Sequence, residues 1–390
     1  MANPGGNGHA LAQALEMPQA EQSARLFIQP DDSAGPLVEG IDGAKKSVDI
    51  LVFRMDRPEV EQALVRAAGR GVQVRALIAY TNRGGERRLR ALESRFLEAG
   101  VVVARTAGDL VRYHGKMMIV DEKELYVLAF NLTFLDMDHS RSFGIATRNP
   151  EFVQEAQKLF EADCLRQEYL PGSDSFLVSP RNAREMLAKF LQAAEKELLI
   201  YDPCVSDAEM VRLLRERARA GVNVRVIGEI KRCPTIPSIS LAQMRLHTRS
   251  MVRDGQSVFI GSQSMRAAEL DARREIGVVL ENRSLAAKVA KVFEKDWELA
   301  NATTEIVGPS KPVAAKKIAK KVAKAVTSAI PPIGAVLEDV IRDVSGPGAD
   351  IGLDAEHLQG AVTEAVKAAV KEAVRDAVVE AVTPGAGDAA

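Results

Sequence analysis

The chain has 390 residues, of which 46% are hydrophobic and 27% are charged, and its formal net charge is −1. These values are typical of a globular chain long enough for two domains with sizeable cores, and they exclude a disordered or fibrous protein. The apolar runs are much shorter than a bilayer-spanning helix requires, so no transmembrane segment is expected. Because the charges balance, no bulk attraction to nucleic acid follows.

The amino-terminal segment, residues 1–23, is predicted to be flexible. It has neither the basic start nor the apolar stretch of a secretory signal, so the cytoplasm is the expected compartment. The three cysteines, Cys164, Cys204 and Cys233, have no paired ligand spacing and cannot all form disulfides within one chain. We expect them to be buried thiols.

An internal duplication organises the rest of the chain. Residues 48–71 recur as residues 198–221, an offset of 150, and each stretch has the pattern of a strand followed by a helix that closes on a glycine. Alternating segments come next at residues 72–78 and 222–227, and these are predicted strands. Each copy therefore begins as a strand, helix, strand unit.

Further along, the copies align at an offset of 133, which places His114 on His247 and Asp121 on Asp254. The first copy holds 17 extra residues, and residues 86–100 within it predict an added amphipathic helix. Each aspartate ends a strand before a turn, where a carboxylate commonly bonds the backbone, so we expect both to be structural. Two related α/β units imply a pseudo-twofold pair with a site at their junction.

The duplication also sets the expected domain boundaries. The first domain is predicted to cover residues 24–170 and the second residues 171–305. Residues 306–390 differ in composition from the rest of the chain. Six lysines occur there with no acidic residue before Glu338, and alanine and valine dominate the remainder. We expect a Lys/Ala-rich linker and a helical tail there.

The matched segments around the two histidines carry the chemistry. They read His114-Gly-Lys116 and His247-Thr-Arg249, and alternation along a strand would point each histidine and its cation to the same face. The ordinary pKa of imidazole, about 6.5, suits one ring to act as a neutral nucleophile and the other as a protonated acid. Two histidines and two cations around a phosphate suffice for a metal-free displacement. Neutral donors for the same oxygens are Asn131, Ser262 and Ser264.

This repeated motif resembles that of the phospholipase D superfamily, whose members carry two His-x-Lys-x4-Asp segments followed by Gly-Ser-x-Asn. The resemblance covers residues 24–300. It implies a duplicated α/β fold, in which two mixed-sheet sandwich units pack with pseudo-twofold symmetry and are followed by a C-terminal helical tail. It also implies a phosphodiesterase or transphosphatidylase that works through a covalent phosphohistidine, with no metal or other cofactor.

Carried over position by position, the resemblance implies that His114 is the nucleophile and His247 the general acid. Lys116 and Arg249 would stabilise the charge on the crowded phosphorus, arginine offering a planar fork where most relatives have an ammonium. Water or a second alcohol would then release the phosphoryl group.

The remaining site residues depart in part from the family pattern. Asn131, Ser262 and Ser264 would orient substrate oxygens, and Glu275 would hydrogen-bond a ring nitrogen and fix its tautomer. The first copy lacks the Gly-Ser pair before Asn131 and has Ser142 where its acidic residue would be. We interpret this as division of labour between the two halves.

The expected reaction is hydrolysis or transfer of the phosphatidyl group of a phospholipid, similar to that of a phospholipase or a cardiolipin synthase. Two alternatives stay open. One is a nuclease of the same superfamily, which the balanced charge of the body disfavours. The other is a weakly active or non-catalytic binding module that retains the fold.

The tail adds two expectations about partners. Residues 311–326 form a basic amphipathic segment suited to peripheral contact with anionic membrane. Valines recur every four residues between residues 355 and 382, so this helix is predicted to self-associate or to dock on the body. A cytoplasmic, membrane-peripheral location is consistent with both.

Overall fold

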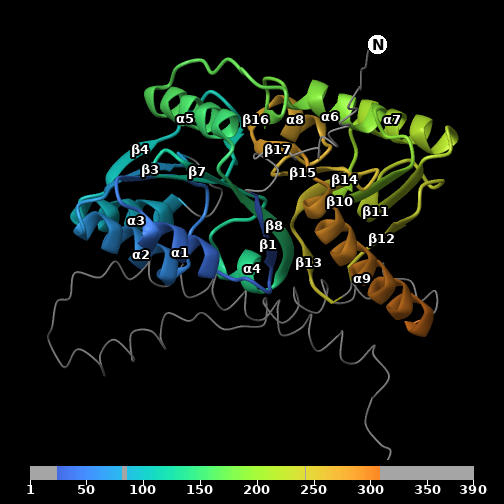
Figure 1. Ribbon diagram of the computed structural model, residues 1–390, viewed down its shortest axis with the longest axis horizontal. Coiled ribbons are helices and arrows are strands. Elements are labelled where there is room, and N and C mark those ends of the chain that lie inside the picture. Colours follow the sequence, from blue (N-terminus) through green and yellow to red (C-terminus); the bar gives the residue numbers. More distant parts are fainter. Residues whose placement is uncertain (1–23, 81–85, 242, 308–390) are drawn as a thin grey trace, which may run out of the picture. The chain divides into compact units, whose positions relative to one another are not determined.

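A computed structural model describes residues 24–80, 86–241 and 243–307 of the chain (Figure 1). It has two mixed sheets with helices on their faces, which confirms the predicted α/β class and the duplicated arrangement. Residues 1–23 and nearly all of the predicted tail lie outside the described residues. Within the described ranges, no helix combines the length and the apolar character that crossing a membrane requires.

The first repeat builds one sheet with the strand order β1-β8-β7-β6-β2-β3-β4, and β13 of the second repeat pairs with β8. The strands of the first repeat are β1 (Arg25–Gln29), β2 (Ser47–Val52), β3 (Gln73–Ile78), β4 (Val102–Arg105), β5 (Arg112–Tyr113), β6 (Met117–Val120), β7 (Glu124–Leu128) and β8 (Ser140–Thr147). Its helices are α1 (Gly35–Gly43), α2 (Pro58–Gly69), α3 (Glu86–Glu98), α4 (Phe134–Asp138) and α5 (Pro150–Leu165). The helix α3 confirms the predicted addition to this repeat.

The second repeat builds the other sheet, with the order β12-β11-β10-β14-β15-β17-β9. Its strands are β9 (Phe176–Val178), β10 (Glu197–Val205), β11 (Asn223–Ile230), β12 (Ser238–Ile239), β13 (Arg245–Leu246), β14 (Arg249–Arg253), β15 (Ser257–Gly261), β16 (Arg273–Arg274) and β17 (Ile276–Glu281). Its helices are α6 (Ala183–Gln192), α7 (Ala208–Arg219), α8 (Ala267–Asp271) and α9 (Arg283–Val307). The expected domain boundary at residues 170 and 171 falls between α5 and β9.

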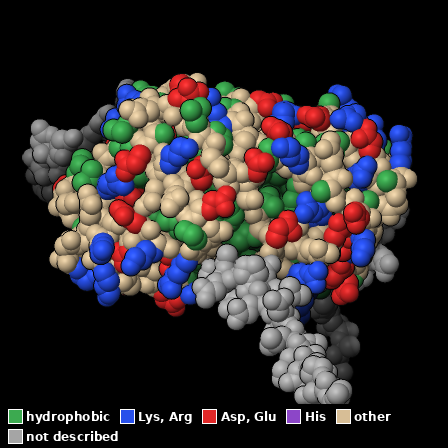
Figure 2. All heavy atoms as spheres, turned by 45° about the horizontal axis from the view of Figure 1, so that its top comes forward, with side chains coloured by type: hydrophobic (Ala, Val, Ile, Leu, Met, Phe, Trp, Pro, Cys, Tyr) green, Lys and Arg blue, Asp and Glu red, His purple; other side chains and the backbone are tan. Residues whose placement is uncertain are grey.

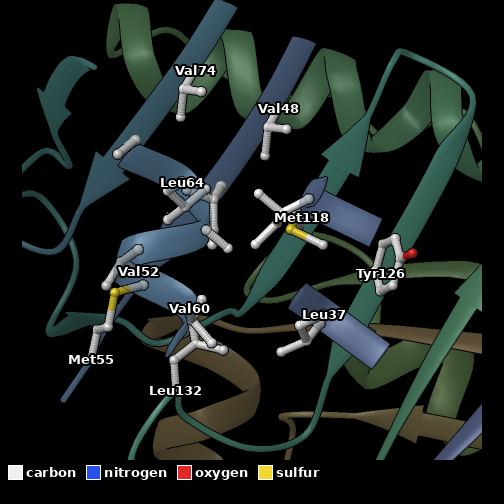
Figure 3. Packing of buried hydrophobic residues seen from close by; sticks show 14 of the residues in the cluster. Leu37, Val48, Val52, Met55, Val60, Leu64, Val74, Met118, Tyr126 and Leu132 are labelled. Atoms are coloured by element: carbon white, nitrogen blue, oxygen red, sulfur yellow. The ribbon is translucent and has the colours of Figure 1, made fainter. Parts of the chain in front are cut away.

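Helix α2 illustrates why these segments fold as they do. Its apolar residues at helical spacing, Val60 and Leu64 among them, are fully buried and belong to the same core cluster as Val48 and Val52 of β2 (Figure 3). Burial of one such side chain contributes about 1.5–3 kcal/mol. Two residues after the helix, Gly71 has a φ of +84°, a left-handed conformation that glycine adopts without strain.

The apolar residues form three clusters, which define the layers of the molecule. One cluster lies between the first sheet and helices α1, α2 and α3, and another between the second sheet and helices α6 and α7. The third combines strands of both sheets with α5 and α9. The two sheets therefore face each other across a shared core, and helices cover their outer faces (Figure 1).

Reciprocal contacts join the two repeats. Strand β5 of the first pairs with β16 of the second, and β13 of the second pairs with β8 of the first. Buried ion pairs cross in the same way: Arg274 Nη2 lies 3.0 Å from Asp163 Oδ1, and Arg141 Nε lies 2.7 Å from Asp296 Oδ2. Arg274 stands 133 residues after Arg141, and Asp296 stands 133 residues after Asp163, so the duplication relates the two ion pairs, as expected for pseudo-twofold symmetry.

The two motif aspartates have the expected structural role. Asp121 accepts hydrogen bonds from three successive backbone amides, residues 45–47, and Asp254 accepts them from residues 195–197. The expectation for the cysteines is only partly right. Cys233 is buried, whereas Cys164 and Cys204 are half-buried, and all three are free thiols.

Candidate active site

The strand pair β5–β16 brings His114 beside Glu275. Tyr113 is in parallel register with Arg274, so the next residues along the two strands are His114 and Glu275. The amide of His114 donates to the carbonyl of Arg274 at 2.7 Å, and Nδ1 of its ring lies 2.9 Å from Oε2 of Glu275. Glu275 is fully buried. A histidine from the first repeat thus contacts a carboxylate from the second.

The strand pair β13–β8 positions His247 in the same way but with a different neighbour. Leu246 is in register with Arg141, whose carbonyl accepts from the His247 amide at 3.1 Å, and the residue after Arg141 is Ser142. Nδ1 of His247 and Oγ of Ser142 are both buried without a hydrogen-bond partner among the described residues. The carboxylate that His247 does contact is Asp136, with Oδ2 3.4 Å from Nε2.

The two cations, Lys116 and Arg249, lie close to their histidines. His114 and Lys116 lie in the short link between β5 and β6, not on a strand as expected, yet Lys116 Nζ is 2.9 Å from His114 Nε2. Arg249 begins β14, and its Nη1 donates to the carbonyl of His247 at 2.7 Å. Its Nη2 lies 3.7 Å from Glu269.

Two carboxylates of the site, Asp136 and Glu269, were not predicted. The amide and the side-chain amide of Asn131 both donate to Asp136 Oδ2, at 2.9 and 2.6 Å, and the amide of Ser264 donates to Glu269 Oε2 at 2.8 Å. Asp136 also forms an ion pair with Arg245. Both acids stand five residues after the motif positions and are related by the offset of 133, which is the signal that could have revealed them.

The predicted neutral donors are engaged with the protein itself. The hydroxyl of Ser264 donates to Asp202. The hydroxyl of Ser262 accepts from the amide of Ile276 at 3.1 Å and lies 3.3 Å from the Ile276 carbonyl. The substrate contacts expected of Asn131, Ser262 and Ser264 therefore stay predictions, because each would have to exchange or share a present partner.

Burial sets the ionisation of the central groups. It lowers the pKa of both His114 and His247 well below the usual value, and the charges of Lys116 and Arg249 add to the effect on each ring. Burial therefore favours the neutral form of both imidazoles. Burial also lowers the pKa of Lys116 to about 7, against the attraction of Glu275, whose own pKa burial raises.

The carboxylate beside His247 behaves differently. Burial opposes ionisation of Asp136, but the neighbouring His247 and Arg245 and the amide of Asn131 outweigh it and lower the pKa. Asp136 is therefore an anion that favours a proton on His247. The site thus holds one imidazole with a carboxylate on Nδ1 and a second imidazole with a carboxylate beside Nε2, an arrangement suited to nucleophilic and acid–base catalysis.

In the described ranges, no three His, Cys, Asp or Glu side chains are grouped to hold a metal ion. Lys116 and Arg249 place positive charge beside the two histidines.

Comparison with known proteins identifies the family. A family model described as "Cardiolipin synthase, PLD-like domain" matches residues 37–164 and 187–297. The chain belongs to this family of the phospholipase D superfamily and has the superfamily's phosphodiesterase-type fold.

Relatives and solved structures extend this result. The polyphosphate kinase of Pseudomonas aeruginosa is 22% identical over 311 residues, covering 69% of this chain and 44% of that protein. The polyphosphate kinase structure from Porphyromonas gingivalis superposes with a TM-score of 0.59 at 18% identity, over 71% of this chain and 51% of that one. The phosphatidylserine synthase structure from Haemophilus influenzae superposes with a TM-score of 0.52 at 9% identity, over 72% of this chain and 86% of that one. The chain spans less than half the length of the curated relatives that it matches, and both structural likenesses concern the fold.

Proposed function

We propose that this chain is a phosphodiesterase of the phospholipase D type, which hydrolyses or transfers the phosphatidyl group of a phospholipid through a covalent phosphohistidine and without a metal ion. The observation that carries the proposal is the buried contact of His114 Nδ1 with Glu275, together with Lys116 Nζ, which lies 2.9 Å from Nε2 and 3.0 Å from Nδ1 of the same ring. A neutral imidazole fixed in this way is a nucleophile, and the adjacent cation attracts the phosphate that it attacks.

In the first step, the lone pair of His114 Nε2 attacks phosphorus while Lys116 moves from the ring to a phosphate oxygen. The P–O bond to the leaving group breaks, and the departing oxygen keeps the bonding electrons and takes a proton from His247. Asp136, 3.4 Å from His247 Nε2, stabilises that ring while it is protonated. The carboxylate of Glu275 balances the positive charge that His114 acquires.

In the second step, water or an alcohol attacks phosphorus and gives a proton to His247. The P–N bond breaks, its electrons return to His114, and the product leaves as the acid or as the transferred phosphatidyl group. His247 must therefore gain a proton although burial lowers its pKa. The negative charge of the bound phosphate raises that pKa again, so substrate binding itself prepares the acid.

The choice of a phospholipid substrate is supported by the family description and by the fold shared with phosphatidylserine synthase. We extend the proposal to the predicted tail. Residues 311–326 would contact anionic membrane, and residues 355–382 would self-associate. The protein would then be cytoplasmic and membrane-peripheral. A nuclease is the weaker choice, because acidic and basic side chains are interspersed on the face seen in Figure 2 and no broad basic surface gathers there.

A second candidate function is phosphoryl transfer on phosphoanhydrides, the kind of substrate named in the polyphosphate kinases. The observation that favours it is a group of cations around Phe53, immediately beside His114. The same phosphohistidine chemistry serves both candidates, since they differ in the groups attached to the reacting phosphorus.

The test compares a lipid with an activated diester. The full chain, in EDTA, should release the head group from phosphatidylglycerol vesicles and p-nitrophenolate from bis(p-nitrophenyl) phosphate. His114→Asn should abolish both reactions. His247→Asn should abolish lipid cleavage but retain one rapid turnover of the activated diester, because p-nitrophenolate leaves without a proton.

The matched control is His139→Asn, since His139 is an exposed histidine whose ring contacts Phe134 outside the catalytic pair. It should leave both reactions unchanged. Parallel incubations with plasmid DNA and with tripolyphosphate plus ADP distinguish the alternatives. Full activity in His114→Asn, or loss of activity in EDTA, would contradict the proposal.

A further inference from the structure

A buried glutamine lies across from the serine that takes the place of Glu275 in the first repeat. The duplication puts Ser142 at that place, and the pairing of β1 with β8 puts Gln29 directly opposite Ser142. Side chains of directly opposed residues in an antiparallel pair lie on the same face of the sheet. Gln29 is 1% exposed and Ser142 is 0% exposed, so the two polar side chains adjoin one another in the interior.

Three polar atoms in this region have no hydrogen-bond partner in the described part of the chain. They are Gln29 Oε1, Ser142 Oγ and His247 Nδ1. The histidine belongs to the same group because its amide bonds the carbonyl of Arg141, which places its ring next to Ser142. Buried polar groups in folded proteins are paired with protein or with ordered water, so three such atoms together indicate one shared partner.

The two repeats differ in which strand supplies the long polar side chain. At the offset of 150, Gln29 corresponds to Ser179, and a proline follows each of them. The amide of Ser179 donates to the carbonyl of Glu275 at 3.0 Å. Each catalytic histidine is therefore flanked by one serine and one long polar side chain, which is a carboxylate near His114 and an amide near His247. The exchange keeps the length of the polar side chain and removes its charge.

The side-chain amide of Gln29 is fixed at its nitrogen. Nε2 donates to the carbonyl of Ser33 at 2.8 Å, and the hydroxyl of Ser33 donates to Asp138 at 2.8 Å. Asp138 is the last residue of α4, the short helix that also carries Asp136. Because the nitrogen is engaged in this way, the oxygen is the end of the amide that can hold a further partner. Gln29 thus presents an acceptor whose position is set by the fold.

We propose that Gln29 is a positioning residue for His247, and that its amide oxygen and the hydroxyl of Ser142 hold one water molecule against Nδ1 of that ring. Asp136 lies 3.4 Å from Nε2, so in the neutral ring the proton is on Nε2 and Nδ1 accepts from the water. In the charged ring Nδ1 donates to the same water. A water molecule can do both, whereas a carboxylate such as Glu275 only accepts.

Such a neutral partner suits the acid of the reaction. It keeps the ring in one orientation while the charge of the ring changes, yet it stabilises the charged form less than a carboxylate would. His247 therefore gives its proton readily to the leaving oxygen, while Glu275 favours a lasting positive charge on His114. The inference deepens the proposed function, on which it rests for the role of His247 as the acid.

The first test compares two substrates in one protein sample. Gln29→Met keeps the length of the side chain and removes its amide. It should lower kcat for head-group release from phosphatidylglycerol vesicles about tenfold or more, with KM changed less than about twofold, because a misplaced acid transfers its proton poorly. The first turnover of bis(p-nitrophenyl) phosphate should change less than about twofold, since p-nitrophenolate leaves without a proton. A loss of folded protein would lower both.

A matched control is Gln263→Met in the second repeat. Gln263 is buried, its Nε2 donates to the carbonyl of Leu177 at 3.1 Å, and its Oε1 also has no hydrogen-bond partner among the described residues. Its side chain lies against Gly261 and Gly277 of the second sheet. Any loss of activity in this variant should be common to both substrates.

The second test follows His247 directly and does not depend on turnover. Gln29→Glu keeps the shape of the side chain and adds a carboxylate, so the proton affinity of His247 should rise about tenfold or more, which NMR titration shows as a higher pKa. Gln73→Glu, at an exposed position of β3, should leave the titration unchanged. Both variants keep the charged groups that act most strongly on the ring, namely Asp136, Lys116, Arg245 and Arg249.

Two results would overturn the inference. One is that Gln29→Met leaves lipid cleavage unchanged or slows both substrates equally. The other is that the titration of His247 does not move in a folded Gln29→Glu variant. Failure of the proposed function would look different, because the unaltered chain would then cleave no lipid while Gln29→Glu would still shift the titration of His247.

Discussion

Oε2 of Glu275 lies 2.9 Å from Nδ1 of His114, although the two residues belong to different repeats of the chain. The duplication places Ser142 at the corresponding position beside His247. The two histidines are therefore equivalent in the fold but not in chemistry. A carboxylate on Nδ1 stabilises the cation that forms when the other ring nitrogen bonds to phosphorus, which supports the proposal that His114 is the nucleophile.

Replacing Glu275 with Gln should slow the reaction. Gln keeps the shape and an acceptor oxygen but removes the charge that balances the phosphohistidine, so kcat should fall about 100-fold with little change in KM. Steady-state kinetics on the activated diester measure this. The control is Glu281→Gln at the edge of the same strand β17, where the carboxylate is exposed and pairs with Arg253. An unchanged kcat in Glu275→Gln would contradict the assignment.

Replacing Ser142 with Asp should make the two histidines more alike. The new carboxylate would stand where the duplication expects one, next to Nδ1 of His247, which has no hydrogen-bond partner in the described part of the chain, and should raise the pKa of that ring. NMR titration of His247 follows the shift directly. A His247 pKa that does not move, in a variant whose melting temperature shows it to be folded, would rule out the proposed equivalence.

The affinity for anions should fall as pH rises through the pKa of Lys116. Burial lowers that pKa to about 7, so in the free protein the ammonium is present below this pH and lost above it. Sulfate is a suitable probe, because its own charge is constant over this range. Its affinity should decline by up to about tenfold per pH unit above pH 7. In Lys116→Arg the decline should disappear, since guanidinium stays protonated. A flat profile in the unaltered chain would disagree with this assignment of charge.

Removing the arginine of one reciprocal ion pair should destabilise the fold in a pH-dependent way. Arg274→Met leaves Asp163 buried and unpaired, and the free energy of unfolding at pH 8 should fall by about 3–5 kcal/mol. Burial raises the pKa of Asp163 to about 6, with Arg274 acting against that shift. The pKa should rise further without the arginine.

The direction of this pH dependence comes from linkage between protonation and folding. A carboxyl that holds its proton more tightly in the folded protein contributes stability at low pH, and that contribution is lost as pH rises through the folded-state pKa. The defect of Arg274→Met should therefore be smaller at pH 5 than at pH 8 in chemical denaturation. Adding Asp163→Asn should remove the difference. Equal losses at both pH values in Arg274→Met would refute the explanation.

Much of the fold could be predicted because the duplication repeats local patterns. The strand, helix, strand units and the added helix α3 are predicted by apolar periodicity, and the structural role of Asp121 by its place at a turn. The pairs His114 with Lys116 and His247 with Arg249 could be proposed from sequence alone, because each lies within three residues of the chain.

The features that the sequence did not reveal depend on contacts between the repeats. The resemblance implied that Glu275 contacts a histidine ring, and the structure confirms it, but which ring it contacts could not be predicted. The strands β5 and β16, whose pairing brings Glu275 to His114, have two residues each and show no alternation that could signal that pairing. Asp136 was missed for another reason. Taken alone, an acid in the first turn of a helix is ordinary, and the recurrence of Asp136 as Glu269 at the offset of 133 was the one sequence signal for it; its contact with His247 forms only in the folded chain.

The most direct test of the central claim is to locate the covalent intermediate. His247→Asn should be mixed with the activated diester, quenched at alkaline pH after the rapid phase, digested, and analysed by mass spectrometry. We expect an acid-labile phosphoryl adduct on His114, and none in the double variant that also carries His114→Asn. An adduct on another residue, or rapid release of p-nitrophenolate with no adduct at His114, would contradict the claim.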